Sequence, residues 1–141
     1  MVDTGPIVSA LNAGEGARHR FAVRLLRQLG AAGVVPWPVY AEAALLLTGR
    51  GMVLAAVRLG RSLQAGELTL AVPTEFEHAQ GLAIVERYAG FGLDLPDAVS
   101  ISMAVARRLP LLTWDFRHAR AVVVSGRPIE LMIDEHELPG H

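Results

Sequence analysis

Four acidic side chains, far apart along this 141-residue chain, stand against strongly apolar segments. Asp3 follows the first apolar residues, Asp97 opens an apolar helical pattern, and Asp115 follows the run LPLLTW. Glu42 interrupts the run VYAEAALLL. A carboxylate is costly to remove from water unless a partner compensates for the lost hydration. Several crowded carboxylates also repel one another unless a divalent cation neutralises them, so the pattern predicts a shared metal site.

The composition narrows the choice of metal and of reaction. The chain has no cysteine and no evident histidine cluster, and hard oxygen ligands favour Mg²⁺ or Mn²⁺ over zinc. All 13 basic residues are arginine. Phosphatases and receiver domains also place an aspartate after a first strand, but they use a lysine in the site. We therefore rank both below a metal-dependent reaction without lysine.

Most of these acids have a structural alternative. Asp3 and Asp97 each stand where a helix N-cap is expected, and Asp115 fits a turn. Asp94 is an additional acid that is either an outer metal ligand or an N-cap or surface carboxylate supporting Asp97. Glu42 has no such explanation, because a single glutamate among alanine and leucine needs a partner. All four acids together are best explained by one site.

The elements that must position these acids alternate between short apolar strands and amphipathic helices. This alternation predicts an α/β fold with a mostly parallel sheet covered by helices on both faces. In such sheets, ligand sites lie beyond the carboxyl ends of the strands. Strands are expected at residues 1–3, 33–36, 67–72, 109–114, 121–124 and 129–133, and helices at residues 6–14, 17–29, 38–50, 52–66, 74–90 and 97–108.

The composition also predicts a single globular domain. Hydrophobic residues make up 52% of the chain and charged residues only 19%, which excludes a disordered chain. We expect the domain to cover residues 1–133 and a polar, loosely held tail to cover residues 134–141. The first residues lack the basic segment of a signal peptide, and no apolar run is long enough for a membrane span, so we expect a cytoplasmic protein.

Four segments, in order, resemble one known family. They are VDTGPIVSAL at 2–11, VPWPVYAEAALLL at 35–47, LDLPDAVSISMAVARR at 93–108 and LLTWDF at 111–116. The sequence resembles PIN-domain ribonucleases, and within them the VapC toxins of bacterial toxin–antitoxin pairs. The resemblance implies a PIN-like three-layer α/β/α sandwich, in agreement with the alternating elements.

The resemblance also implies a function and a set of site residues. Members of the family cleave RNA with Mg²⁺ or Mn²⁺, and VapC toxins commonly cleave tRNA or ribosomal RNA. They usually form homodimers and are inhibited by a small VapB-like antitoxin. The family's pattern carries over to catalytic, metal-binding acids at Asp3, Glu42, Asp97 and Asp115, with Thr4 and Thr113 as supporting hydroxyls and Asp94 as a further supporting acid.

Several details differ from the family pattern or stay open. Only two residues precede Asp3, which predicts a short first strand. Close relatives often carry a second aspartate after the position of Asp115, where His118 stands nearby; we expect this histidine to be a bystander. Arg117 and Arg120 are candidate RNA contacts because guanidinium groups suit phosphate. Two alternatives are a PIN nuclease of RNA processing and a catalytically inactive PIN binding module.

Overall fold

Short parallel strands form the centre of the fold. The computed structural model describes residues 1–140. Strand β1 (Val34–Pro36) pairs in parallel with β2 (Thr69–Ala71). On the other side of β1, the amide of Val2 donates a hydrogen bond to the carbonyl oxygen of Val34 at 2.8 Å. The amino-terminal residues therefore extend the sheet, as the sequence predicts.

Two further segments continue this sheet. Val2 forms a parallel bridge with Leu112, and the amide of Asp3 donates to the carbonyl of Leu112 at 2.9 Å. Leu111 forms a parallel bridge with Leu131. The sheet order is thus the segment of Leu131, the segment 111–112, the amino terminus, β1 and β2. Asp3 and residue 113 leave the sheet side by side.

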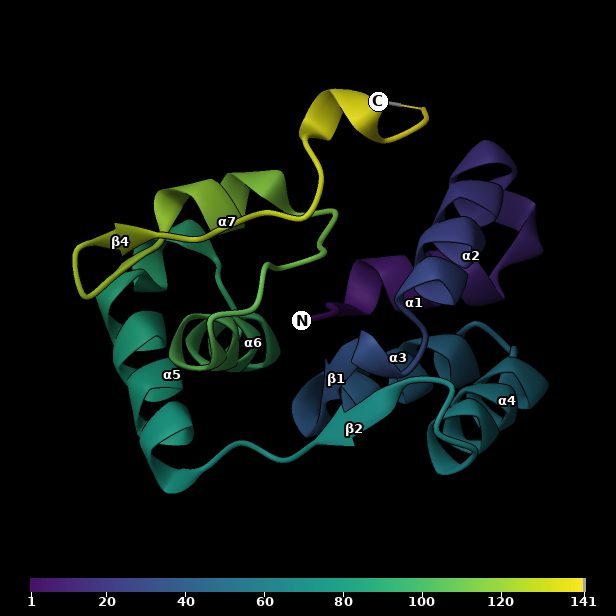
Figure 1. The fold of residues 1–141 in the computed structure, drawn as a ribbon, viewed down its shortest axis with the longest axis horizontal. Helices are drawn as coiled ribbons and strands as arrows, with labels where there is room; N and C mark the ends of the chain where they lie inside the picture. Colours follow the sequence, from purple (N-terminus) through teal and green to yellow (C-terminus); the bar gives the residue numbers. More distant parts are fainter. Residues whose placement is uncertain (141) are drawn as a thin grey trace.

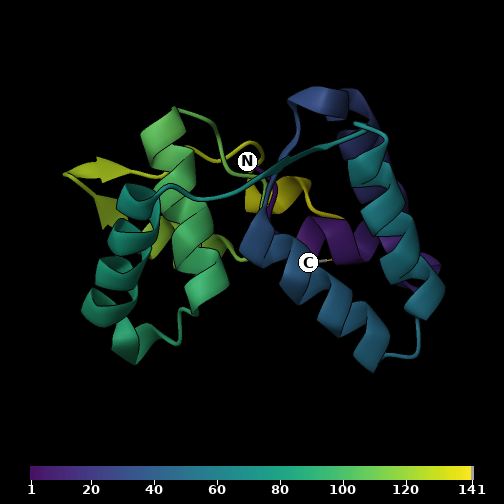
Figure 2. The ribbon, with the colours of Figure 1, turned by 90° about the horizontal axis from the view of Figure 1, so that it is seen from below.

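Seven α-helices enclose these strands in the part of the chain that the structure describes. Helices α1 to α4 lie on one side of the molecule and α5 to α7 on the other, with the amino terminus between them (Figures 1 and 2). This arrangement confirms the α/β/α sandwich expected from the sequence. The helices are α1 (Thr4–Leu11), α2 (Ala17–Leu29), α3 (Trp37–Gly49), α4 (Val53–Gln64), α5 (Glu75–Arg87), α6 (Leu95–Arg107) and α7 (Phe116–Ala121).

The core consists of two clusters on opposite faces of the strands. Successive strand residues point to opposite faces. Accordingly, Met1 and Leu111 belong to the cluster beneath α5 and α6, whereas Val2 and Leu112 belong to the cluster beneath α1 and α3. The sheet therefore separates two helical layers. The carboxyl ends of its central strands lie between these layers.

The local structure differs from the sequence predictions in several places. Helix α7 was not expected, and residues 129–133 contribute only the bridge at Leu131 instead of a strand. Helix α6 begins at Leu95 rather than at Asp97, because the Oδ1 atom of Asp94 accepts a hydrogen bond from the amide of Asp97 at 3.0 Å and caps the helix. The segment predicted as a strand at 121–124 contributes β3 (Val123–Val124), which pairs antiparallel with β4 (Arg127–Pro128). A turn with positive φ at both central residues favours this hairpin.

The carboxyl-terminal segment is more firmly held than predicted. Leu138 is only 3% exposed and belongs to the second core cluster. The guanidinium of Arg120 lies 2.7 Å from the carboxylate of Glu135. One buried leucine and an ion pair thus attach a segment that looks merely polar in the sequence; residue 141 lies outside the described residues. Among residues 1–140, no helix combines the length and apolar character needed to cross a membrane.

Candidate metal-binding site

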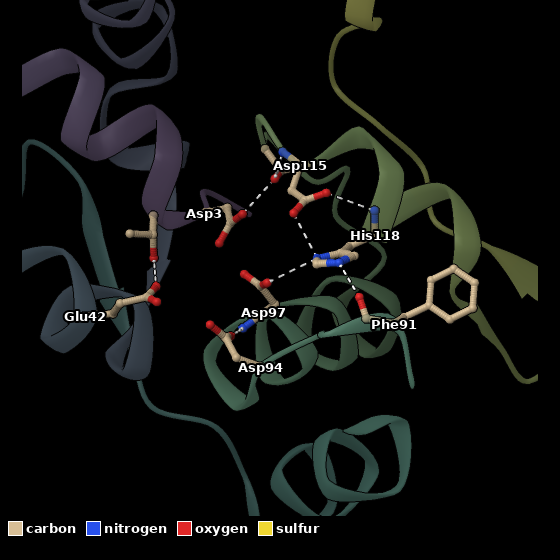
Figure 3. Close-up of polar contacts among 9 residues, drawn as sticks. Asp3, Glu42, Phe91, Asp94, Asp97, Asp115 and His118 are labelled. Atoms are coloured by element: carbon tan, nitrogen blue, oxygen red, sulfur yellow. Dashed lines mark hydrogen bonds and ion pairs between the residues drawn. The ribbon is translucent and has the colours of Figure 1, made fainter. Parts of the chain in front are cut away.

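The four predicted acids converge on one cavity of about 560 Å³. They come from different elements: Asp3 follows the first strand, Glu42 lies on α3, Asp97 lies in the first turn of α6, and Asp115 precedes α7. Figure 3 shows their side chains gathered around a common space. The cavity is also lined by Thr4, Gly5, Leu46, Asp94, Trp114, Phe116, Arg117 and Glu135.

Asp3 is the most buried of these acids, with 6% exposure. Its Oδ2 atom accepts a hydrogen bond from the hydroxyl of Thr113 at 2.7 Å, and that hydroxyl accepts one from the amide of Asp115 at 2.9 Å. Thr113 therefore orients the carboxylate of Asp3 and the backbone of Asp115. The Oδ1 atom of Asp3 is buried without a hydrogen-bond partner among the described residues. Asp3 makes no side-chain cap to α1, so the N-cap explanation does not hold for it.

Glu42 faces the cavity from the opposite wall. Its Oε2 atom accepts a hydrogen bond from the hydroxyl of Thr4, so this threonine fixes an acid on another helix rather than capping its own. Burial raises the pKa of Glu42, and the charges of Asp94 and Asp3 raise it further. The hydrogen-bond partner that Glu42 needs in its apolar run is therefore supplied within the site, by Thr4.

Asp97 carries the strongest sign of crowding. Its side chain is 22% exposed. Burial raises its pKa to about 8, and the neighbouring charges of Asp3, Asp94, Glu42 and Asp115 act in the same direction. The N-cap role belongs to Asp94, which leaves both carboxylate oxygens of Asp97 free of that function. The site is thus poor in positive charge at the position where the acids meet.

His118 lies closer to the acids than its place in the sequence indicated. The Oδ1 atom of Asp115 accepts a hydrogen bond from the amide of His118 at 2.9 Å and caps α7. The Nδ1 atom of His118 lies 2.8 Å from Oδ2 of Asp115 and 3.8 Å from Oδ2 of Asp97. The three-residue spacing from the capping aspartate thus places the imidazole against Asp97 and Asp115, whereas the sequence indicated only that it stands nearby.

The donor set fits a divalent cation. One ligand atom from each of Asp97, Asp115 and His118 lies within 4.8 Å of the others. Burial raises the pKa of Asp3 as well, against the opposing hydrogen bond from Thr113. Cations offset such repulsion and accept lone pairs from oxygen and nitrogen. The buried, unpartnered Oδ1 of Asp3 is an oxygen that such an ion would satisfy.

The two arginines proposed as RNA contacts have different surroundings. Arg117 is exposed, lines the cavity, and places its guanidinium carbon 5.9 Å from the centre of the Phe91 ring. Arg120 is paired with Glu135 and lies over the ring of Phe116. Of the two, Arg117 is the one that borders the acids. RNA binding by either stays a prediction.

Comparison with solved structures finds the same fold in a toxin and in a chain of a toxin–antitoxin complex. VapC20 from Mycobacterium tuberculosis, described as a sarcin-ricin loop cleaving toxin, is 24% identical, with a TM-score of 0.75 over 90% of this chain and 98% of that one. A toxin–antitoxin complex from Klebsiella pneumoniae is 20% identical, with a TM-score of 0.62 over 91% of this chain and 98% of that chain. No match was found among curated protein sequences.

Comparison with protein families gives a match over most of the chain. Residues 1–123 match the model of the PIN domain, and this range includes all four acids, both threonines and His118. The match agrees with the order of the four sequence segments, the parallel sheet and the acidic cavity at its edge. The chain belongs to the PIN domain family.

Proposed function

We propose that this protein is a metal-dependent endoribonuclease of the VapC type. The observation that carries the proposal is the convergence of Asp3, Glu42, Asp97 and Asp115 on one cavity, with a buried carboxylate oxygen of Asp3 left unpartnered. Membership of the PIN domain family and the fold shared with VapC20 support it.

The roles of the side chains follow from their contacts. When bound, Mg²⁺ or Mn²⁺ lowers the pKa of a water and offsets charge on the phosphate. Asp3, Asp97 and Asp115 would hold the cation; Thr113 engages the Oδ2 atom of Asp3 and leaves its Oδ1 atom available as a ligand. Glu42 keeps one oxygen on Thr4 and uses the other to orient the water or to accept its proton.

The substrate phosphate also needs a positively charged side chain of the protein. Arg117 is the only basic residue that lines the cavity within the described part of the chain. A guanidinium group binds a phosphate through paired hydrogen bonds. Because the chain has a net charge of −1, this positive surface is local, and we expect the salt dependence of RNA binding to be modest.

The similar solved structures bear on the substrate and the partners. VapC20 is described as cleaving the sarcin-ricin loop, which supports an RNA substrate. As in VapC toxins generally, the proposed target is tRNA or ribosomal RNA and the proposed location is the cytoplasm. The likeness to a toxin–antitoxin complex favours inhibition by a VapB-like antitoxin. Apolar side chains exposed on α3 and α4 offer a surface for that antitoxin or for a homodimer: Leu45, Leu46, Val53, Leu54 and Val57.

A cleavage assay with purified protein tests the proposal. Incubation with tRNA or with ribosomal RNA fragments in Mg²⁺ or Mn²⁺ should give defined products, and EDTA should abolish them. Asp3→Asn and Asp97→Asn should each lower the rate by on the order of 100-fold or more, because the charge stabilisation supplied by the cation is lost. Glu86→Gln, an exposed acid on α5, is the control and should cleave normally.

Two outcomes would contradict the proposal. Wild-type protein that binds RNA without cleaving it in either metal would be a catalytically inactive PIN module. Active protein whose expression leaves growth unaffected, with no adjacent antitoxin gene, would be a PIN nuclease of RNA processing rather than a toxin.

A further inference from the structure

The imidazole of His118 has a defined proton position. Its Nε2 atom lies 2.9 Å from the carbonyl oxygen of Phe91. A carbonyl oxygen can only accept a hydrogen bond, so Nε2 carries the hydrogen. In the neutral ring, Nδ1 then carries a lone pair, and Figure 3 shows this edge of the ring turned toward Asp97 and Asp115.

The surroundings of Nδ1 lack a donor. The atom is buried and has no hydrogen bond to any described residue, although two carboxylate oxygens lie 2.8 Å and 3.8 Å away. An ionised carboxylate also only accepts hydrogen bonds. With a neutral ring and with both carboxylates ionised, as a bound cation requires, Nδ1 and the carboxylates of Asp97 and Asp115 face one another as acceptors, and the Oδ1 atom of Asp3 has the same unmet need in the same site.

The ring is held in this orientation by a fixed neighbouring segment. The hydroxyl of Tyr88 accepts a hydrogen bond from the amide of Val123 at 3.1 Å, and the guanidinium of Arg117 lies over the ring of Phe91. These contacts attach residues 88–91 to Arg117 of α7 and to Val123 of β3, which flank His118 in the sequence. A histidine that binds a metal through one nitrogen usually donates from the other to a carbonyl or a carboxylate, which is the arrangement here.

We propose that Nδ1 of His118 is a ligand of the cation held by Asp97 and Asp115, and that the site therefore prefers Mn²⁺ to Mg²⁺. This inference rests on the metal-dependent function proposed above and defines its metal site more closely. Mg²⁺ prefers oxygen ligands and gives up its water reluctantly, whereas affinity for nitrogen rises along the divalent transition metals. The competing explanation is an imidazolium ion paired with both carboxylates, which would repel a cation.

Electron paramagnetic resonance of Mn²⁺ bound to the full chain separates these explanations. In the wild type, we expect coupling between the Mn²⁺ electron spin and a histidine nitrogen. Labelling histidine with ¹⁵N should change this coupling, which would assign it to a histidine. In His118→Gln this coupling should disappear, and the Kd for Mn²⁺ should rise by about 10–100-fold. The Kd for Mg²⁺, measured by calorimetry, should change much less. His78→Gln, an exposed histidine on α5, should behave as the wild type.

Each remaining outcome overturns the inference in a recognisable way. Mn²⁺ bound to the wild type without nitrogen coupling would exclude His118 as a ligand and leave the metal-dependent nuclease proposal intact. Tighter Mn²⁺ binding in His118→Gln would support the imidazolium ion pair instead. Wild-type protein that binds neither cation would remove the inference together with the proposed function. The nitrogen coupling is measured on the wild type, so the test stands even where the variant folds poorly.

Discussion

At the scale of single residues, the protonation of Asp97 links the site to the stability of the protein. Without a cation, burial and neighbouring acids raise the pKa of this carboxyl from 3.8 to about 8. The folded state therefore holds a proton that the unfolded state releases above about pH 4. The stabilisation due to this proton is complete below pH 4 and is lost as the pH rises toward 8. The metal-free protein should become less stable over that range.

Replacing this carboxylate tests the linkage. In EDTA at pH 8.5, Asp97→Asn should be more stable than the wild type by on the order of a few kcal/mol, because it removes a charge that is costly to bury. At pH 4 the two proteins should be nearly equal. Urea denaturation at both values measures the difference, with Glu86→Gln as the control. A stability difference that does not vary with pH would show that Asp97 is already ionised in the folded protein.

The individual residues differ in how far their place in the site could be predicted from the sequence. Glu42 was predictable because an acid in an apolar run needs a partner, and the aspartates because each follows a strand or begins a helix. The contact of His118 with the acids could not be predicted because it depends on α7, a helix of only six residues with little periodicity to detect. Thr113 was expected as a supporting hydroxyl and accepts a hydrogen bond from the amide of Asp115, but its bond to Asp3 joins residues 110 positions apart and could not be predicted.

At the scale of elements, close packing of α5 on α6 places Asp97. A Cβ atom at Gly81 would lie 2.7 Å from Cγ2 of Val99 and 3.2 Å from its Cα. The same pair of helices is tied by Glu77, which is 4% exposed and ion-paired with Arg107 at 2.7 Å. Arg107 holds the pKa of Glu77 down at about 2. Glu77 also forms a capping box with Thr74, a spacing that is visible in the sequence, but its burial is not, because the ion pair depends on the neighbouring helix.

An added methyl group tests this helix contact. Gly81→Ala should lower the free energy of unfolding by about 1–2 kcal/mol, because the cost of overpacking exceeds the gain in helix propensity. Gly49→Ala is the matched control: nothing lies within 4 Å of its Cβ position, and its stability should change by less than about 0.5 kcal/mol. Urea denaturation gives both values. Equal stability of the two variants would mean that α5 and α6 can move apart without cost.

At the scale of the whole molecule, the site lies where the two helical layers meet. Glu42 and Thr4 belong to helices on one side, and Asp97 and His118 to helices on the other, with the sheet end between them (Figures 2 and 3). The parallel sheet was predictable from short apolar strands alternating with helices. The short β3–β4 hairpin and the anchored carboxyl-terminal segment were not, since each depends on a turn conformation or on one buried side chain.

A cation bound at this junction should stabilise both layers together. At a concentration about 100 times its Kd, a ligand that binds only the folded state adds roughly 2.7 kcal/mol, which corresponds to a rise in Tm of roughly 5–10 °C for a domain of this size. We expect this rise for the wild type in Mn²⁺ by thermal denaturation, and its reversal by EDTA. Asp97→Asn should lose most of it, while Glu86→Gln should keep it. An equal rise in Asp97→Asn would place the stabilising cation elsewhere on the protein, because the acids at the junction would then contribute nothing to its binding.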